Sequence, residues 1–280
     1  MTELEVQTAL RSRVRALLES GEIGYFIGWE NTRREGVTRA AFITAPEEAE
    51  KLVWDRRCVS STAKYLLADR WPKQRIGVAV RGCDSRAVNR LLADKQLRRE
   101  DVYLIGLPCA GKDNPACARC THKNPLVYDE LIGDTVPENP DADRFGRIAE
   151  MEALPLAERR RFWEAAFSKC IRCYACRNVC PCCNCRECYA DQYRTGWQGK
   201  QMNTAENRVY GLTRAYHVGD RCIECGECER VCPVDLPIML QTGKILRDIN
   251  ALFGPTENGL SADETPALGK YELGDMDDFM

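Results

Sequence analysis

The sequence has only two histidines, no long apolar run and no excess of either charge. So few imidazoles argue against zinc sites built on histidine and against histidine-based catalysis. Lys and Arg total 40 against 42 Asp and Glu, a net charge of −2, so a nucleic-acid-binding protein is not expected. No stretch approaches the roughly 18–20 apolar residues of a membrane helix, and the charged N-terminus is unlike a signal peptide. We therefore expect a cytoplasmic protein without a membrane span.

Cysteine, by contrast, is abundant: the chain has 17, and twelve of them lie between residues 170 and 232. In a reducing cytoplasm these thiols cannot be interpreted as a disulfide framework. Their density therefore predicts metal sites whose ligands are thiolates.

The first 150 residues predict an α/β domain with a partly parallel sheet. Thr2 and Glu5 form a capping box at the start of an amphipathic helix. Residues 24–29 and 39–44 are short β-rich runs around a polar turn, which is typical of a hairpin, and a further helix is expected at 61–69.

A β–α–β unit follows. Residues 75–80 and 101–107 have the continuous apolar character of buried parallel strands, and 85–94 predicts the helix between them, with Asp84 as its N-cap. Each strand ends in a turn with one cysteine, and ligands bind at the carboxyl ends of parallel strands. These cysteines are Cys83 and Cys109. Small buried thiols packed in turns are the alternative.

Three segments are expected along the chain: the α/β domain at 1–150, a ferredoxin-like α+β domain at 151–245, and an acidic tail at 246–280 that is expected to be poorly ordered from Gly254. After Cys109 the chain is expected to be irregular to about residue 143, because this stretch is rich in turn-forming residues; it contains Cys117 and Cys120. A helix at about 156–167 leads into the cysteine-rich segment.

Two segments match each other and the C-x2-C-x2-C-x3-C-P run of two-cluster ferredoxins, in which the fourth cysteine ligates the other cluster. Zinc knuckles would show pairs of cysteines rather than triplets followed by Cys-Pro. The predicted ligands are Cys170, Cys173, Cys176 and Cys232 for one [4Fe–4S] cluster, and Cys222, Cys225, Cys228 and Cys180 for the second.

The linker between the repeats opens with four more thiols, Cys182, Cys183, Cys185 and Cys188. A third metal centre, a [4Fe–4S] cluster or zinc, could use three of them. We expect Cys183, Cys185 and Cys188 in this centre, with a fourth ligand from Cys83, Cys109, Cys117 or Cys120. A zinc knuckle of Cys117, Cys120 and two of the linker thiols competes with it.

The remainder of the linker predicts a helix and loops packed over the clusters. It carries Tyr193, Trp197, Tyr210 and Tyr216. Four arginines near the cysteines could raise cluster potentials or simply be solvated surface charge. They are Arg172, Arg177, Arg186 and Arg194.

The α/β part resembles the beta subunits of deazaflavin-coenzyme-reducing hydrogenases and formate dehydrogenases. The motifs are Arg-Gly-Cys-Asp-Ser-Arg-Ala (81–87), Gly-Leu-Pro-Cys (106–109) and Cys117-x2-Cys120. Its fusion to Cys-Ile-Arg-Cys-Tyr-Ala-Cys (170–176) is similar to iron–sulfur proteins of formate dehydrogenase and heterodisulfide-reductase-like complexes. The resemblance implies FAD in some members, but no flavin-binding residue matches here and no G-x-G-x-x-G follows a strand.

These features predict an iron–sulfur electron-transfer subunit of an anaerobic oxidoreductase complex, whose partners are redox protein subunits. Substrate chemistry would then belong to a partner. The alternative is a flavin-containing oxidoreductase that passes hydride-derived electrons to its own clusters.

Overall fold

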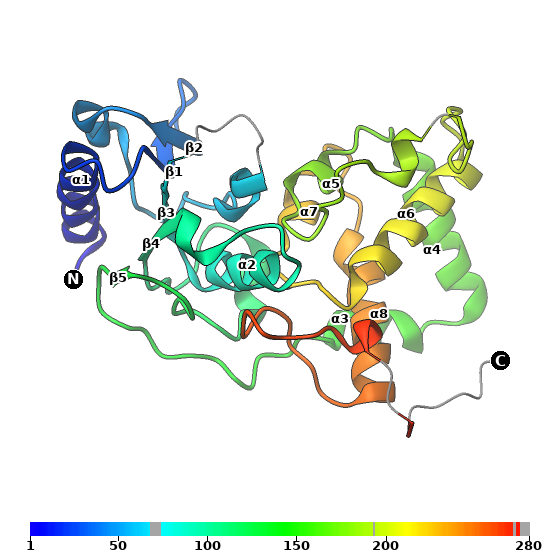
Figure 1. Ribbon diagram of the computed structural model, residues 1–280. Helices are drawn as coiled ribbons and strands as arrows, with labels where there is room; N and C mark the ends of the chain where they lie inside the picture. The colour runs from blue at the N-terminus through cyan, green and yellow to red at the C-terminus, as the bar shows by residue number, and fades with distance from the viewer. Residues whose placement is uncertain (68–73, 193, 271–272, 275–280) are drawn as a thin grey trace. The chain divides into compact units, whose positions relative to one another are not determined.

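The computed structural model describes residues 1–67, 74–192, 194–270 and 273–274 (Figure 1). Contacts within the chain divide it into two units. The sheet unit comprises Met1–Ala142 and Gly259–Glu264, and the helical unit comprises Asp143–Asn258 and Thr265–Met280. Tyr193 and the end of the predicted helix at 61–69 lie outside the described residues. None of the described helices is long and apolar enough to cross a membrane.

The sheet unit contains a five-stranded sheet in the order β2-β1-β3-β4-β5. The β1 and β2 strands form the expected antiparallel hairpin, and the β1–β3, β3–β4 and β4–β5 pairs are parallel. The bounds are Tyr25–Asn31 (β1), Thr38–Ile43 (β2), Ile76–Val80 (β3), Val102–Gly106 (β4) and Glu130–Leu131 (β5). The expected partly parallel α/β architecture is therefore confirmed.

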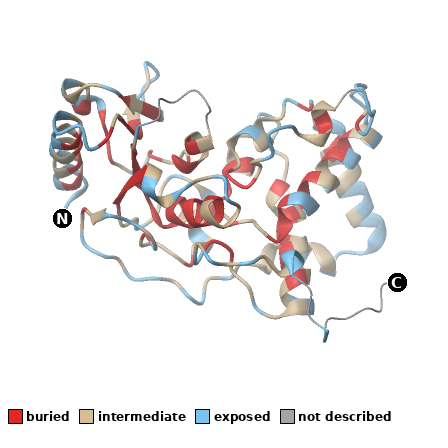
Figure 2. Ribbon diagram, in the orientation of Figure 1, coloured by how far each residue is buried: buried red, intermediate tan, exposed pale blue. Residues whose placement is uncertain are grey.

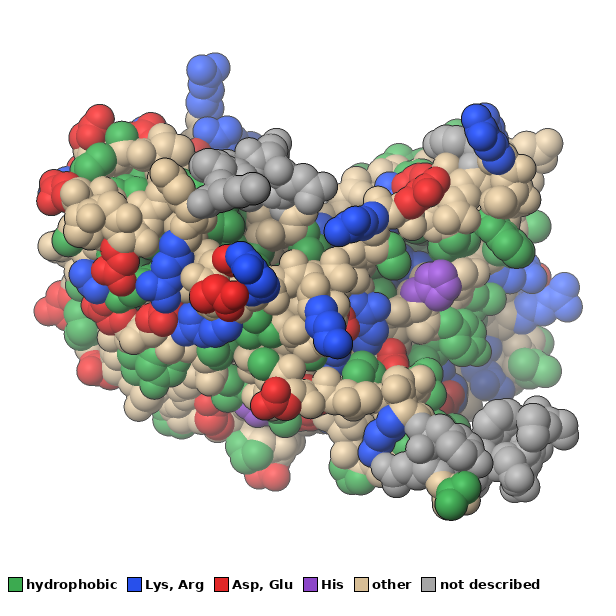
Figure 3. Space-filling view, viewed as in Figure 1, with side chains coloured by type: hydrophobic (Ala, Val, Ile, Leu, Met, Phe, Trp, Pro, Cys, Tyr) green, Lys and Arg blue, Asp and Glu red, His purple; other side chains and the backbone are tan. Residues whose placement is uncertain are grey.

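Helices α1 (Glu3–Glu19) and α2 (Gly82–Ala93) lie on opposite sides of the β3–β4 pair (Figure 1). The capping box of Thr2 and Glu5 begins α1 as expected. Four residues along one stripe of α1 are buried in the core: Val6, Leu10, Val14 and Leu17. Both central strands are buried along their whole length, as Figure 2 shows by colour. Acidic and basic side chains are interspersed on the visible face of this unit (Figure 3).

Two sequence expectations in the sheet unit are wrong. Asp84 is not the N-cap of α2, which begins at Gly82 after the N-cap residue Arg81; Asp84 is the third helical residue, and its carboxylate accepts from the N–H of Arg81. The stretch 108–143 is not wholly irregular. It supplies β5, which pairs with β4 although it is only two residues long and carries no strand periodicity.

The helical unit consists of helices and loops, and its described residues contain no strand. Its helices are α3 (Gly146–Ala153), α4 (Leu156–Lys169), α5 (Ala175–Val179), α6 (Thr204–Gly219), α7 (Glu227–Arg230) and α8 (Ile238–Phe253). Helix α4 agrees with the prediction at 156–167, whereas α3 was not predicted. Short 3-10 helices complete the chain at Pro46–Lys51, Ala63–Leu67, Arg99–Asp101, Pro115–Arg119, Tyr189–Asp191 and Ala267–Gly269.

The expectation of a poorly ordered tail is wrong for residues 258–264. The Asn258 side chain is buried and its amide donates to the carbonyl of Cys222. Within the sheet unit, the side-chain amide of Asn89 donates to the carbonyls of Gly259 and Leu260, at 3.1 and 3.2 Å. Acidic composition alone did not indicate these anchors.

Candidate metal centres

The two cysteine repeats fold into matching loops. At equivalent positions, Arg172 and Glu224 have φ angles of 46° and 58°, and Tyr174 and Gly226 have 59° and 71°. A short helix begins directly after Tyr174 in the first repeat and directly after Gly226 in the second. Each helix is followed by a Cys-Pro pair. The C-x2-C-x2-C-x3-C spacing is therefore accommodated by the same sequence of backbone conformations in both repeats.

Backbone N–H groups also point at sulfur in the same way. The N–H of Arg172 donates to Cys170 Sγ and that of Glu224 donates to Cys222 Sγ, both with N···S distances of 3.4 Å. The N–H of Leu236 donates to Cys232 Sγ at 3.3 Å. Such bonds stabilise negative charge on sulfur, so these loops suit thiolates bound to a metal cluster.

The first thiol set is the one expected for the first cluster. Cys170 interacts electrostatically with three other thiols, and burial raises its pKa. These neighbours are Cys173, Cys176 and Cys232. The structure thus brings the crossover cysteine of the second repeat to the loop of the first.

The second thiol set contains Cys180, Cys222, Cys225 and Cys228, the residues expected for the second cluster. Cys222 interacts with Cys180 and Cys228. Burial raises the pKa of Cys222, and raises that of Cys228 to about 12. Without a metal these buried thiols would remain protonated; a bound cation reverses that preference. The donor set therefore fits a cluster that neutralises the thiolates.

Cys182 belongs to the surroundings of this second set, a role that the sequence did not indicate. It is buried and interacts with Cys180, Cys222 and Cys225. Hydrogen bonds from the thiols of Cys182 and Cys183 lower the pKa of Cys180. Only the close spacing along Cys180-Pro-Cys182-Cys183 could have suggested this grouping.

A third thiol set lies in the sheet unit, where the turns after β3 and β4 meet the loop at 117–123. A Cβ on Gly82 would come within 2.1 Å of the His122 carbonyl oxygen, so this close approach requires glycine. The N–H of Cys109 donates to the carbonyl of Lys123 at 3.0 Å. Four thiols interact as a result: Cys83, Cys109, Cys117 and Cys120.

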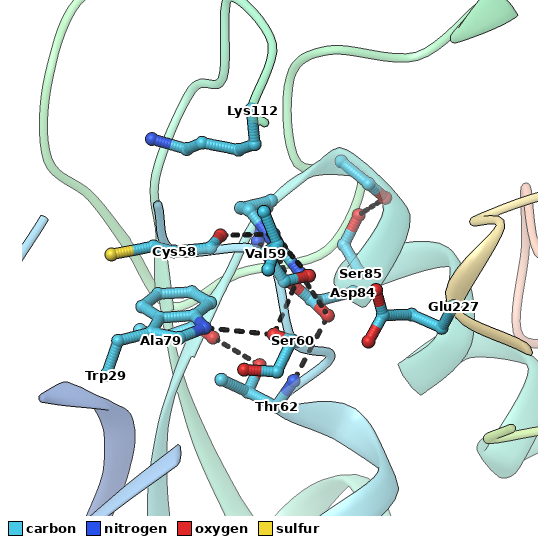
Figure 4. Close-up of polar contacts among 12 residues, drawn as sticks. Trp29, Cys58, Val59, Ser60, Thr62, Ala79, Asp84, Ser85, Lys112 and Glu227 are labelled. Atoms are coloured by element: carbon cyan, nitrogen blue, oxygen red, sulfur yellow. Dashed lines mark hydrogen bonds and ion pairs between the residues drawn. The ribbon is translucent and has the colours of Figure 1, made fainter. Parts of the chain in front are cut away.

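Two buried cations border this third thiol set, and sequence reasoning missed both. The Arg81 guanidinium pairs with Asp84 at 2.6 Å and donates to the carbonyls of the 58–60 turn. Figure 4 labels Asp84 and the three residues of this turn. The guanidinium interacts with Cys83 and Cys109. The Lys112 ammonium lies 3.5 Å from the centre of the Trp54 ring and interacts with Cys109, while burial lowers its pKa. Both charges favour thiolates at this edge of the sheet.

The remaining linker thiols have different surroundings. Cys183 contacts Cys180, Cys188 interacts with Arg177, and Cys185 is exposed. Two of the four arginines that the sequence singled out have structural partners: Arg172 donates to the carbonyls of Gly199 and Gln201, and Arg177 pairs with Asp191. Arg186 and Arg194 are exposed.

In the described part of the chain, no group of three or more Cys, His, Asp or Glu side chains is arranged around a position for a single metal ion. A cubane needs a wider arrangement than one ion, because each of its four thiolates binds a different iron.

Comparisons with known proteins agree with this geometry. A family model described as a 4Fe-4S dicluster domain matches residues 166–236. The "F420-dependent formate dehydrogenase subunit beta" of Methanocaldococcus jannaschii is 21% identical, with 70% of this chain and 77% of the relative aligned. The "F420-dependent formate dehydrogenase 1 subunit beta" of Methanococcus maripaludis is 22% identical, with 55% and 67% aligned. The chain is therefore an iron–sulfur relative of the beta subunits of these formate dehydrogenases, with a 4Fe-4S dicluster domain in its helical unit.

Proposed function

We propose that the chain transfers electrons within a multi-subunit anaerobic oxidoreductase of the cytoplasm, and that the substrate reacts on a partner subunit. The observation that carries this proposal is the pair of matching loops: Cys232 of the second repeat lies near the thiols of the first loop, and Cys180 of the first repeat lies near Cys222 of the second. The similarity to subunits of formate dehydrogenases supports formate as the substrate class of the complex.

The first and second thiol sets would each hold one [4Fe–4S] cluster, which supplies one-electron transfer when bound. Each repeat would supply one ligand to the cluster of the other repeat: Cys232 would bind the first cluster, and Cys180 would bind the second. The chain itself would contribute four sulfur ligands per site, N–H bonds to Cys170 and Cys222, and surroundings that bury Cys228 and leave only Cys173 of the eight thiols exposed. These features set how readily an electron is accepted at each site.

We further infer that a third metal centre, a [4Fe–4S] cluster rather than zinc, uses the thiol set of the sheet unit. The mutual interactions of Cys83, Cys109, Cys117 and Cys120 favour this set over one built on Cys183, Cys185 and Cys188. Arg81 and Lys112 would offset part of the negative charge of four thiolates.

Metal analysis and a matched pair of variants test the third centre. Anaerobically purified protein should contain about twelve irons per chain for three cubanes. Cys117→Ser should lose about four irons, whereas Cys185→Ser should lose none. If Cys185→Ser loses about four irons and Cys117→Ser loses none, the third centre is bound by the linker thiols instead. About eight irons with one zinc would select the knuckle, and about eight without zinc would show that the third set binds nothing.

The function is tested with the complex isolated from its source organism under anaerobic conditions. Formate added to the complex should bleach the cluster absorbance near about 400 nm, whereas formate added to the isolated chain should leave it unchanged. If the isolated chain reacts alone and releases a flavin on acid extraction, the alternative of a self-contained flavin oxidoreductase replaces our proposal.

A further inference from the structure

Helix α6, which lies in the linker between the two repeats, turns one buried face toward the first loop. Asn207, Tyr210 and Arg214 share this face because they are three and four residues apart. The Asn207 amide donates to the carbonyls of Phe167 and Cys170, at 2.9 and 2.8 Å. Tyr210 Oη lies 3.8 Å from Cys176 Sγ. The helix is thus attached to the backbone and to a sulfur of the first thiol set.

Arg214 extends this face toward both thiol sets. Its side chain is only 6% exposed, and Nη2 donates to the carbonyl of Cys176 at 3.1 Å. The guanidinium interacts with Cys176 of the first set and with Cys180 and Cys228 of the second. Among the described residues, no hydrogen-bond acceptor faces Nε. A delocalised positive charge is therefore buried against sulfur atoms that would ligate two different clusters.

Three other charged side chains of the two loops form ion pairs, whereas Arg172 donates to backbone carbonyls. In the second loop, Glu224 pairs with Arg144 at 2.6 Å and Glu227 pairs with Arg230 at 2.6 Å. In the first, Arg177 pairs with Asp191 at 2.7 Å. Within the described residues, no carboxylate forms an ion pair with Arg214. Its charge is balanced by sulfur, so its field at the cluster sites is not offset by a nearby carboxylate.

We propose that Arg214 is a positioning residue whose fixed positive charge raises the reduction potentials of both iron–sulfur clusters. The inference rests on the proposed binding of these clusters by the first and second thiol sets. Each reduction adds one electron to a cluster, and a buried cation stabilises the added negative charge strongly because the surroundings screen it poorly. No proton moves, since the guanidinium remains protonated throughout the accessible pH range.

The test is an anaerobic redox titration of the full chain, followed by electron paramagnetic resonance. Arg214→Met and Arg214→Gln both remove the charge, and the glutamine can still donate to the Cys176 carbonyl. Arg214→Lys keeps a charge. Arg208→Met is the matched control, because Arg208 is on the same helix but exposed. Dithionite is the reductant for every variant, and the iron content of each protein is measured before its titration.

In the two neutral variants we expect the equilibrium constant for reduction to fall at least tenfold at both clusters. For a one-electron couple this corresponds to a reduction potential lower by about 59 mV. The lysine variant should shift less, and Arg208→Met should match the wild type at high salt, where surface charges are screened. If either neutral variant retains its iron with unchanged potentials, the proposal is overturned. It is also overturned if both neutral variants lose iron while the lysine variant keeps it, because the charge would then serve cluster retention. A wild-type chain without iron would instead refute the proposed function.

Discussion

The two cysteine loops share one backbone but differ in exposure. The isoleucine after the first cysteine of each repeat shows this directly: Ile171 is 50% exposed, whereas Ile223 is 3% exposed. Cys173 is exposed while its counterpart Cys225 is half-buried, and Cys176 is half-buried while its counterpart Cys228 is buried. Cysteine spacing and the positive φ angles determine the loop conformation, and the residues packed around each loop determine its access to solvent. We therefore expect a redox partner to exchange electrons through the first thiol set.

The largest expected effect concerns the ligands that the loops exchange. Cys180→Ser should abolish the cluster of the 222–228 loop and spare that of the 170–176 loop, while Cys232→Ser should do the opposite. Iron content and the electron paramagnetic resonance signal of the remaining cluster distinguish the two variants. Assignment of Cys180 to the cluster of its own repeat would contradict the crossover and remove the basis of the comparison.

The likeness of the loops also predicts that both depend on metal for their structure. Oxidative loss of iron should unfold about residues 168–240, because buried thiols and polar loops replace most of an apolar core there. The sheet unit has its own core around Leu10, Phe26 and Ile105 and should remain folded. Hydrogen exchange of the apo-protein measures this. Protection of the 168–240 region without iron would show that the two loops fold independently of their clusters.

The difference in exposure is tested by a matched pair of truncations. Ile223→Ala removes a buried side chain and should destabilise the iron-loaded protein by about 2–4 kcal/mol. Ile171→Ala should change the stability by less than about 0.5 kcal/mol, because its side chain is half exposed. Denaturant unfolding under argon gives both values. Equal effects would mean that the two loops are equally buried in solution.

The smallest effect concerns the left-handed residue of each loop. Gly226→Ala should destabilise by about 1 kcal/mol, since alanine is strained at a φ of 71°. Tyr174→Gly relieves the same strain but loses the edge contact with Tyr210 and the stacking of Arg177. We expect its net effect to be near zero. A stability loss in Tyr174→Gly as large as in Gly226→Ala would show that the ring contacts outweigh the backbone term.

Much of the architecture could be predicted from patterns with a local cause. Continuous apolar runs indicated β3 and β4, and the capping box indicated α1. The repeated cysteine spacing predicts the ligands of two clusters, which the ligand variants above would test. The resemblance to hydrogenase and dehydrogenase beta subunits agrees with the relatives found.

Features that depend on distant contacts could not be predicted. The two-residue strand β5 exists only because β4 offers it a parallel edge. Arg214 is separated by 34 residues or more from Cys180 and Cys176, so no short motif joins them. The grouping of Cys83 with Cys120 likewise depends on the contact between Gly82 and His122. The sequence marked these cysteines as candidate ligands, but nothing in it indicated that they lie together.

The hydrogen bonds from Asn89 to Gly259 and Leu260 have a consequence for cluster assembly. They return the chain to the sheet unit after α8, so the main segment of the helical unit, Asp143–Asn258, is followed as well as preceded by residues of the sheet unit. If iron is lost, its cysteines remain on a closed loop whose ends are held together. The entropy of loop closure is then already lost before iron returns, and the thiols keep a raised effective concentration for repair.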